Sequence, residues 1–415
     1  MGGTRWKWNA PMSVARSVEA GFFPLDQELQ VPDGHLLPHA YESLVSMSSE
    51  LPFGRAVTHL ERTLGVVVHA STARRQTLAV GQRMLEVQNT QAQPLSACPE
   101  EKASERMAMS SDGSMVPLVG GVWAEVKVVA IGAVERRMRK GEEQIVTTDL
   151  TYFARMANAA TFADQASAEL RRRGIERAKQ VCAIQDGAEW IQGFVQGHRH
   201  DALRILDFAH AAKYVYEIAD KVREGGGHLP AKWVDGVLHR LKHEGPTRVL
   251  RHLSRLARRY PQIQEQVTYL QKRRELMDYP SYQQQGWPIG SGSVESSHKL
   301  VVQARLKGPG MHWKPEHVNP MLALRLALLN ERWTESWQDQ YRLRQRQQHL
   351  KRQARQQQRL REQQAKRQET HPPPLPVPST PKPPRQKTGR TEAQYRWGRH
   401  TFSPRMLKQA DGAKK

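Results

Sequence analysis

The sequence predicts an α/β protein built on a mixed β-sheet, and three patterns lead to this class. Residues 122–130 alternate apolar and polar side chains, which is the period of a half-buried strand. Over residues 161–180 the apolar side chains recur every four positions, which predicts a helix. The short apolar run at 181–184 ends at Asp186 and Gly187 and is typical of a buried strand.

The N-terminal part is predicted to be helical after an irregular start. Residues 1–35 contain scattered prolines and glycines, whereas residues 36–95 have helical periodicity. One helix is expected to end at Gly65, and a second to begin at Ser71, which is a good N-cap. Together they form a helix-turn-helix candidate that would bind DNA through Arg74 and Arg75, or equally an ordinary helical hairpin.

Residues 103–215 contain the predicted sheet. Strands are expected at 107–111, 122–130 and 144–155, then at 181–184 and 202–206, with helices between the last three. This order, β-β-β-α-β-α-β, is the succession found in the ribonuclease-H-like fold, a mixed sheet with helices on its faces. We therefore expect residues 103–215 to form the first part of a catalytic core.

The remaining chain divides into three predicted parts. Residues 216–285 form an all-helical insertion, and residues 286–337 return to the core as its last helices. Residues 338–415 are rich in Arg and Gln and then in Pro, with few large apolar side chains. Such a segment buries too little surface to fold alone, so a disordered basic tail is expected.

Positive charge is concentrated in this tail. The chain has a net charge of +22, and residues 341–415 contain 20 Lys or Arg against 4 Asp or Glu, a net +16. The first 340 residues are therefore only mildly basic, at +6. A polyanion is the expected partner of the tail, with an affinity that falls as salt rises.

Cysteine content and hydropathy favour a reducing, cytosolic protein. The two cysteines, Cys98 and Cys182, are too few for a four-cysteine zinc site or a disulfide framework. Cys182 lies in an apolar run and is expected to be a buried core residue. No run approaches 18 apolar residues, and the N-terminus lacks the apolar core of a signal peptide, so no membrane partner is expected.

Two aspartates and a glutamate form the candidate catalytic site. Asp112 and Asp186 each follow a predicted strand, and carboxylates at one sheet edge repel each other unless they share a proton or bind a cation. Oxygen ligands favour Mg²⁺ or Mn²⁺, and a third carboxylate, Glu295, would complete a site for two ions. The alternative is structural, because Asp-Gly is a common turn and a first-turn Glu stabilises the helix dipole.

Polar residues outside this triad are weaker candidates. Asp207 and His210 are one helical turn apart and could face the same site, or Asp207 could cap a helix. Four basic residues are candidates for phosphate contacts: Lys127, Lys299, Arg305 and Lys307. The alternative for these is a solvated face, which is slightly favoured for Lys127.

Several sequence blocks resemble bacterial insertion-sequence transposases of the ISKra type, a DDE group related to the Mutator-like transposases. The most specific is GWPIGSGSVESSHK at 286–299. The others follow in the family's order: SDG at 111–113, WAEVK at 123–127, DGAEWI at 186–191, ILDFAH at 205–210, RLK at 305–307, GMHW at 310–313, LR at 324–325 and NERW at 330–333. The similarity extends from about residue 22 to 337.

The resemblance implies a transposase with a ribonuclease-H-like core and a helical insertion before the glutamate. Asp112, Asp186 and Glu295 match the catalytic triad, and Asp207 and His210 match an Asp-x-x-His element that shapes the site. It further implies two Mg²⁺ or Mn²⁺ ions, cleavage and strand transfer at the ends of an insertion sequence, and a homodimer or larger complex. The expected location is the bacterial cytoplasm, at the nucleoid.

Three other functions remain open from the sequence. A related metal-dependent nuclease would share the carboxylates without transferring strands. A DNA-binding remnant of a transposase is a second alternative, because members of the family often carry paired cysteines where this chain reads AGFFPLD at 20–26. A basic scaffold or RNA-binding protein would account for the tail but not for the catalytic blocks.

Overall fold

The computed structural model describes residues 36–93, 104–139 and 141–370. The irregular segment expected at residues 1–35, Cys98 and the proline-rich end of the tail lie outside the described residues. Within them, no helix combines the length and the apolar character that crossing a membrane requires.

A mixed five-stranded sheet forms the centre of the α/β fold, as the sequence predicted. Its strands lie in the order β3-β2-β1-β4-β5. β2 is antiparallel to β1 and to β3, whereas β4 is parallel to both β1 and β5. The strands are β1 (Arg106–Pro117), β2 (Trp123–Arg139), β3 (Glu142–Arg155), β4 (Gln180–Gln185) and β5 (Leu203–Leu206).

Both faces of the sheet are buried. In β1, Met107 and Met109 join one hydrophobic cluster while Ala108 between them joins another, as the two-residue period of a strand requires. On one face, Phe162 of α5 (Ala159–Arg173) contacts the rings of Phe153 and, in α6 (Glu189–His198), Phe194. α5 and α6 therefore pack on the face of the sheet that carries Phe153.

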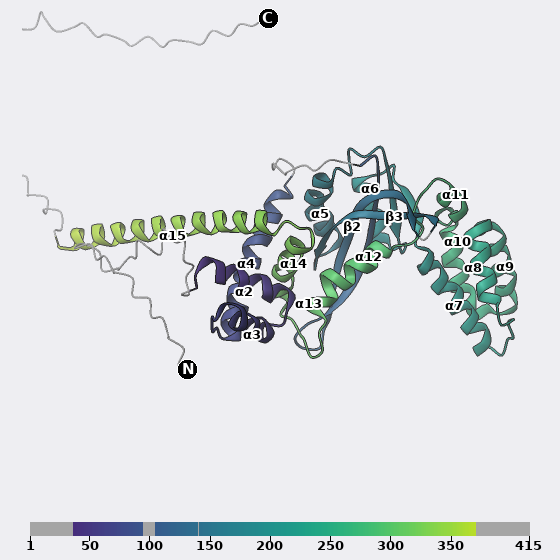
Figure 1. Cartoon of the computed structure of the whole chain (residues 1–415), viewed down its shortest axis with the longest axis horizontal. Coiled ribbons are helices and arrows are strands. Elements are labelled where there is room, and N and C mark those ends of the chain that lie inside the picture. Colours follow the sequence, from purple (N-terminus) through teal and green to yellow (C-terminus); the bar gives the residue numbers. More distant parts are fainter. Residues whose placement is uncertain (1–35, 94–103, 140, 371–415) are drawn as a thin grey trace, which may run out of the picture. The chain divides into compact units, whose positions relative to one another are not determined.

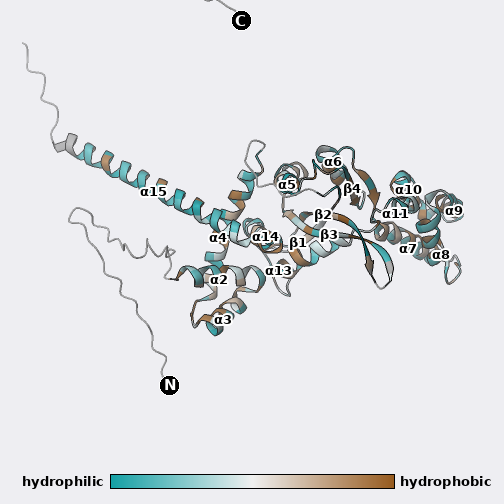
Figure 2. Ribbon diagram, turned by 45° about the horizontal axis from the view of Figure 1, so that its top comes forward, coloured by the Kyte–Doolittle hydropathy of each residue, from teal (hydrophilic) through white to brown (hydrophobic). Residues whose placement is uncertain are grey.

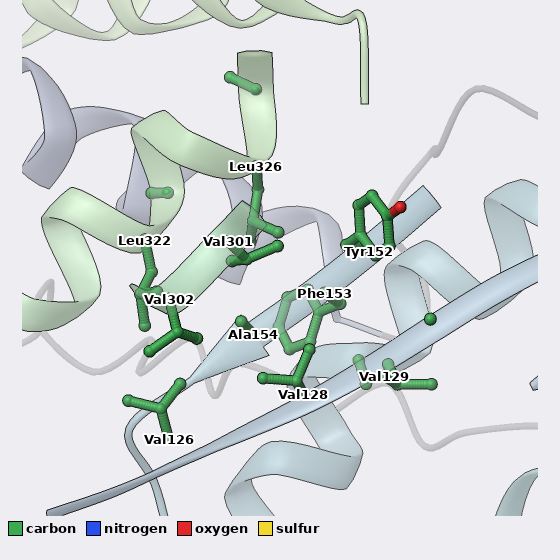
Figure 3. Close-up of a cluster of buried hydrophobic side chains, with 14 of the residues drawn as sticks. Val126, Val128, Val129, Tyr152, Phe153, Ala154, Val301, Val302, Leu322 and Leu326 are labelled. Atoms are coloured by element: carbon green, nitrogen blue, oxygen red, sulfur yellow. The ribbon is translucent and has the colours of Figure 1, made fainter. Parts of the chain in front are cut away.

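Part of the other face is covered by helices from late in the chain (Figure 1). These are α12 (Gly292–Ser297), the π-helix η3 (His298–Gln303), α13 (Ala304–Leu306) and α14 (Pro315–Leu329). Figure 3 shows Val301 and Val302 of η3 and Leu322 of α14 above Val126 and Val128 of β2. The helical path is interrupted after α14 at residues 330–332, where Glu331 has a positive φ of 58°.

Within the described residues 36–93, the helices before the sheet are α2 (Pro38–Glu50), α3 (Phe53–Leu64) and α4 (Ala70–Gln91). Gly65 ends α3 in the left-handed conformation, as predicted. The N-cap of α4 is His69 rather than Ser71, and its ring accepts a hydrogen bond from the Ser71 amide. Only a glycine fits at position 81 of α4, because a Cβ there would lie 2.4 Å from the Pro320 carbonyl oxygen of α14.

The insertion between β5 and α12 is all-helical, as predicted (Figure 1). Its helices contribute Ile218, Leu253 and Val267 to the second hydrophobic cluster of the molecule, the one that includes Ala108 of β1. The insertion ends with the short helix α11. The elements are α7 (Phe208–Glu224), α8 (Trp233–Glu244), α9 (Pro246–Arg259), η1 (Pro261–Ile263), α10 (Gln264–Lys272), η2 (Arg274–Leu276) and α11 (Tyr279–Gln284).

The predicted disorder from residue 338 onward is wrong for residues up to 370. The single helix α15 (Trp333–Thr370) continues through the Arg/Gln-rich segment, and it is hydrophilic over most of its length (Figure 2). Arg, Gln, Lys, Glu and Leu are all good helix formers, so this composition favours a helix even without a core. Its first turns pack on the N-terminal helices: Trp337 contacts the Tyr41 ring, and Arg83 Nε donates to Gln340 Oε1 at 2.8 Å.

Candidate functional site

Asp112 and Asp186 lie next to each other at one edge of the sheet. The parallel pairing of β1 with β4 ends at Ser111 opposite Gln185, so the two aspartates follow the last pair directly. The prediction that β1 ends at Asp112 is wrong, since β1 continues to Pro117 and pairs Asp112 with Val128 of β2. Asp112 is nevertheless the first residue of β1 that no longer pairs with β4, so Asp112 and Asp186 lie together where this pairing ends.

Asp207 belongs to the same edge. It directly follows β5, whose Leu206 is paired with Gln185, and its amide donates to the Gln185 carbonyl at 2.8 Å. Its carboxylate caps α7 by accepting from the Ala209 amide at 3.1 Å. The same carboxylate accepts from the Ser291 hydroxyl at 2.6 Å, which ties the start of α7 to the segment before α12.

The carboxyl group of Asp112 is electrostatically strained. Burial raises its pKa to about 6, and the negative charges of Asp186 and Asp207 act in the same direction. The Gly113 amide, which donates to Asp112 Oδ1 at 2.6 Å, opposes this rise, as does His210. Three carboxylates and a histidine therefore share one electrostatic environment, which is the kind of setting that marks functional sites.

His298 is a member of this site that the sequence reasoning missed. Its Nδ1 lies 3.8 Å from Asp112 Oδ2, and its side chain is 13% exposed. Burial lowers the pKa of His298, and the positive charge of Lys307 lowers it further. A signal was present in the sequence, because a residue three positions after Glu295 lies on the same helical face.

Glu295 does not join the aspartates. It lies in the first turn of α12, as predicted, but its side chain is 68% exposed and its Oε1 accepts from Lys299 Nζ at 2.8 Å. That hydrogen bond lowers the pKa of Glu295. His298, one turn further along, is the side chain through which this helix reaches Asp112.

His210 faces the helical insertion as well as the aspartates. Its ring meets Tyr214 edge-on at 5.4 Å and Tyr269 at 6.0 Å. Tyr214 and Tyr269 are stacked with their ring centroids 3.9 Å apart. The insertion thus contributes aromatic side chains directly beside the carboxylates.

Two of the basic residues expected to contact phosphates are buried. Lys127 is only 9% exposed, pairs with Glu125 and lies 5.3 Å from the Trp190 ring, so neither a phosphate contact nor a solvated face describes it. Arg305 is fully buried, and its Nε donates to the Ser48 carbonyl at 3.0 Å. Arg305 links α13 to α2, and Lys127 of β2 lies beside Trp190 of α6. Local sequence reveals neither contact.

The other basic candidates keep some exposure. Lys307 follows α13 and is close enough to His298 to lower its pKa. Lys299 is exposed and paired with Glu295. Arg74 and Arg75 are both exposed on α4, between its buried Ala73 and Thr77.

The donor set fits a divalent cation in part. Among the residues that the structure describes, no three His, Cys, Asp or Glu side chains form a group that could hold a metal ion. Asp112 and Asp186 still suit a cation. A bound positive charge would offset the cost of burying the Asp112 carboxylate and its repulsion by Asp186, which both raise the pKa of Asp112. Carboxylate oxygens suit Mg²⁺ or Mn²⁺.

Comparison with known proteins adds no relative to this description. No family model matches the sequence, and no curated protein matches it.

Proposed function

We propose that the chain is a DDE-type transposase that cleaves and joins DNA at the ends of an insertion sequence. The observation that carries this proposal is the shared sheet edge of Asp112, Asp186 and Asp207, where the pKa of Asp112 is raised to about 6. A mixed sheet in which three strands precede two strand–helix units supports a ribonuclease-H-like core. The blocks that resemble ISKra-type transposases supply the reaction class.

In this proposal Asp112 and Asp186 hold Mg²⁺ or Mn²⁺, two ions in the full site. When bound, such ions stabilise the charge on the attacking and leaving oxygens of a phosphodiester. Asp207 fixes the start of α7 and keeps negative charge at the edge, and His210 lies beside it to grip the strand that is cut. His298 lies beside Asp112, with its Nδ1 3.8 Å from Asp112 Oδ2.

Glu295 becomes the third ligand by exchanging partners. Its contact with Lys299 is an exposed i,i+4 pair, and such pairs are weak because solvent screens them. A cation held by the two aspartates competes with that pair for the Glu295 carboxylate. His298 lies next to Asp112, so the helix that carries Glu295 is already beside the site.

DNA is the proposed partner on several surfaces. Lys307 lies near the carboxylates, Arg74 and Arg75 are exposed on α4, and the residues after Leu350 are strongly basic. Two element ends must be handled together, so we propose a homodimer or larger complex. A cytoplasmic location at the nucleoid goes with this role.

The test is strand cleavage and joining on linear DNA that carries the element's own ends, with Mg²⁺ or Mn²⁺. Wild type is compared with Asp112→Asn, Asp186→Asn and Glu295→Gln. Glu217→Gln is the matched control, because Glu217 is a partly exposed glutamate on α7 that pairs with Lys213. We expect cleavage and joining in wild type and control, and a loss of at least about 100-fold in the three site variants.

The other outcomes separate the alternatives. Cleavage without joining would indicate a metal-dependent nuclease. Binding without cleavage, with either metal, would indicate a transposase remnant. Undiminished activity of Glu295→Gln would remove Glu295 from the site while leaving Asp112 and Asp186 in it.

A further inference from the structure

The helical insertion grips the turn that carries Asp186. The Tyr269 hydroxyl, on α10, donates a hydrogen bond to the Asp186 carbonyl oxygen. One turn later, Arg273 Nη2 donates to the Gly187 carbonyl oxygen at 2.8 Å. Two consecutive carbonyl groups, directly after β4, are therefore held by side chains from one helix of the insertion.

Tyr269 is fixed from both sides of its ring. The Arg273 guanidinium lies 3.6 Å from the ring centroid, and the Tyr214 ring stacks at 3.9 Å with an interplanar angle of 8°. Two planar groups this close to one ring must occupy its opposite faces. The order Arg273–Tyr269–Tyr214 leaves the Tyr269 hydroxyl little freedom to point elsewhere than at Asp186.

The approach of Arg273 requires a glycine at position 187. Gly187 has φ of +84°, which other residues rarely adopt, and a Cβ there would lie 2.2 Å from Arg273 Nε. The Asp-Gly dipeptide is thus explained by a tertiary contact as well as by its turn. The turn and the insertion are complementary in shape at this point.

The Tyr269 hydroxyl remains a hydrogen-bond donor over the working pH range. Burial raises its pKa well above the ordinary value of a tyrosine, and nearby Arg273 only partly opposes this. A second tyrosine of the insertion acts alike at the neighbouring strand, since the Tyr279 hydroxyl donates to the Leu206 carbonyl at 3.0 Å. Leu206 is the residue before Asp207.

From these contacts we propose that Tyr269 and Arg273 are positioning residues, through which the helical insertion sets the place of the Asp186 carboxylate and hence the affinity of the site for divalent cations. This inference rests on the proposed function in one respect, namely that Asp112 and Asp186 hold a cation. Neither residue needs to touch DNA or the cation, since Tyr269 acts on the backbone of Asp186 and Arg273 on that of the next residue, Gly187.

The test measures Mn²⁺ binding to the full chain by electron paramagnetic resonance, without DNA. Tyr269→Phe removes one hydroxyl and keeps the stacked ring, and Arg273→Ala removes the second hydrogen bond. Tyr282→Phe is the matched control, because the Tyr282 hydroxyl also donates to a backbone carbonyl of the insertion, that of Glu275, at 2.7 Å. Asp186→Asn provides the reference for lost binding.

We expect Tyr269→Phe and Arg273→Ala each to weaken Mn²⁺ binding by about tenfold, as is usual for groups that orient a ligand, with Tyr282→Phe unchanged. Thermal unfolding identifies any variant that has lost its fold. If Arg273→Ala does not fold, the Mn²⁺ affinity of Tyr269→Phe alone tests the positioning role. Equal Mn²⁺ affinity of wild type and Tyr269→Phe would overturn the positioning role.

DNA cleavage, measured separately, keeps this result distinct from the proposed function. Wild type that cleaves DNA, together with unchanged Mn²⁺ affinity in Tyr269→Phe, would remove only the positioning role. Wild type that neither binds Mn²⁺ nor cleaves DNA would overturn both. Weaker Mn²⁺ binding in Tyr269→Phe, in a chain that cleaves no DNA, would support the positioning role alone.

Discussion

At the residue scale, Asp112 shows that a charged group in the candidate site lowers the stability of the folded protein. Its carboxyl group is 38% exposed, yet burial and two neighbouring aspartates raise its pKa to about 6. A raised carboxyl pKa means that the folded protein holds the charged form less well than the unfolded chain does. The charge at this edge is therefore a cost to folding.

Asp112→Asn is accordingly expected to stabilise the protein at pH 7. Wild-type Asp112 is charged in both states above pH 6, so its full penalty applies there, and the penalty is lost as pH falls from about 6 to about 4. After allowance for solvent screening we expect a gain of about 1 kcal/mol at pH 7 that vanishes near pH 4. Urea unfolding of both proteins across this range measures it, and a gain that is constant with pH would contradict the assignment.

Arg305 and Lys307 are close in sequence but differ in expected role. Arg305 is stacked within 4.7 Å of the Phe53 ring and bonds to Ser48, whereas Lys307 lies near the site. Arg305→Ala is expected to destabilise the fold by about 3 kcal/mol, since it leaves a cavity and an unpaired carbonyl. Lys307→Ala is expected to weaken DNA binding at nearly unchanged stability. Denaturant unfolding and DNA titration of both variants measure these effects. A destabilised Lys307→Ala, or an Arg305→Ala of normal stability that binds DNA weakly, would contradict the assignment.

These residues show what the sequence could reveal of the site. Asp112, Asp186 and Asp207 were predictable because each follows an apolar run that forms a strand, and strand ends gather at an edge. The burial of Arg305 was not predictable, because its partners Ser48 and Phe53 are more than 250 positions away in sequence. The pairing of Glu295 with Lys299, in contrast, was open to prediction, because Glu and Lys four positions apart are neighbours on a helix.

At the element scale, the contact between α4 and α14 depends on a single glycine. Gly81→Ala would place a methyl group 2.4 Å from the backbone of Pro320, which cannot move as a side chain can. We expect a loss of about 2 kcal/mol in the free energy of unfolding, in the range of overpacked cores.

Gly193→Ala is the matched control for this change. Gly193 is also a helical glycine, in α6, and nothing lies within 4 Å of an added Cβ there. Since alanine favours a helix, we expect Gly193→Ala to stabilise by about 0.5 kcal/mol. Urea unfolding compares both variants with wild type, and equal effects of the two substitutions would show that the α4–α14 contact is not tight.

Elements with a clear period were predictable, and those defined by tertiary contacts were not. Alternation identified β2, and a four-residue period identified α5. The continuation of β1 beyond Asp112 depends on pairing with β2, so it required the partner strand. The helix at 338–370 was missed because low apolar content was taken as disorder, although the same residues have high helix propensity.

At the scale of the whole molecule, the chain divides into two units, residues 1–350 and residues 351–415. The first unit contains the sheet, the insertion and the start of α15, where Gln340 is buried and Gln347 donates to Glu86 at 2.9 Å. The second unit, from Lys351 onward, contains 17 Lys or Arg and 4 Asp or Glu. The boundary between the two units thus nearly coincides with the start of the strongly basic segment.

This division determines how the tail's role in DNA binding should be tested. Truncation after Leu350 leaves the contacts of Gln340 and Gln347 intact, whereas truncation at residue 340 would remove the Gln347 contact with α4. We expect the chain that ends at Leu350 to unfold at nearly the same temperature as the full chain. Its DNA affinity should fall at low salt, because the tail's cations no longer release counterions from the phosphates.

The decisive quantity is the salt slope rather than the affinity. Each phosphate that a protein neutralises on duplex DNA contributes about −0.9 to the slope of log K against log salt, so losing even five tail contacts changes it by about 4 to 5. Affinity measured by fluorescence anisotropy on one duplex from 50 to 300 mM salt, roughly the range in which such contacts act, gives the slope for full and truncated chains. Arg74→Ala with Arg75→Ala, two exposed cations outside the tail, should change it by only about 2. An equal slope for full and truncated chains would mean that the DNA lies on the first unit alone, and that the basic C-terminal residues serve another purpose.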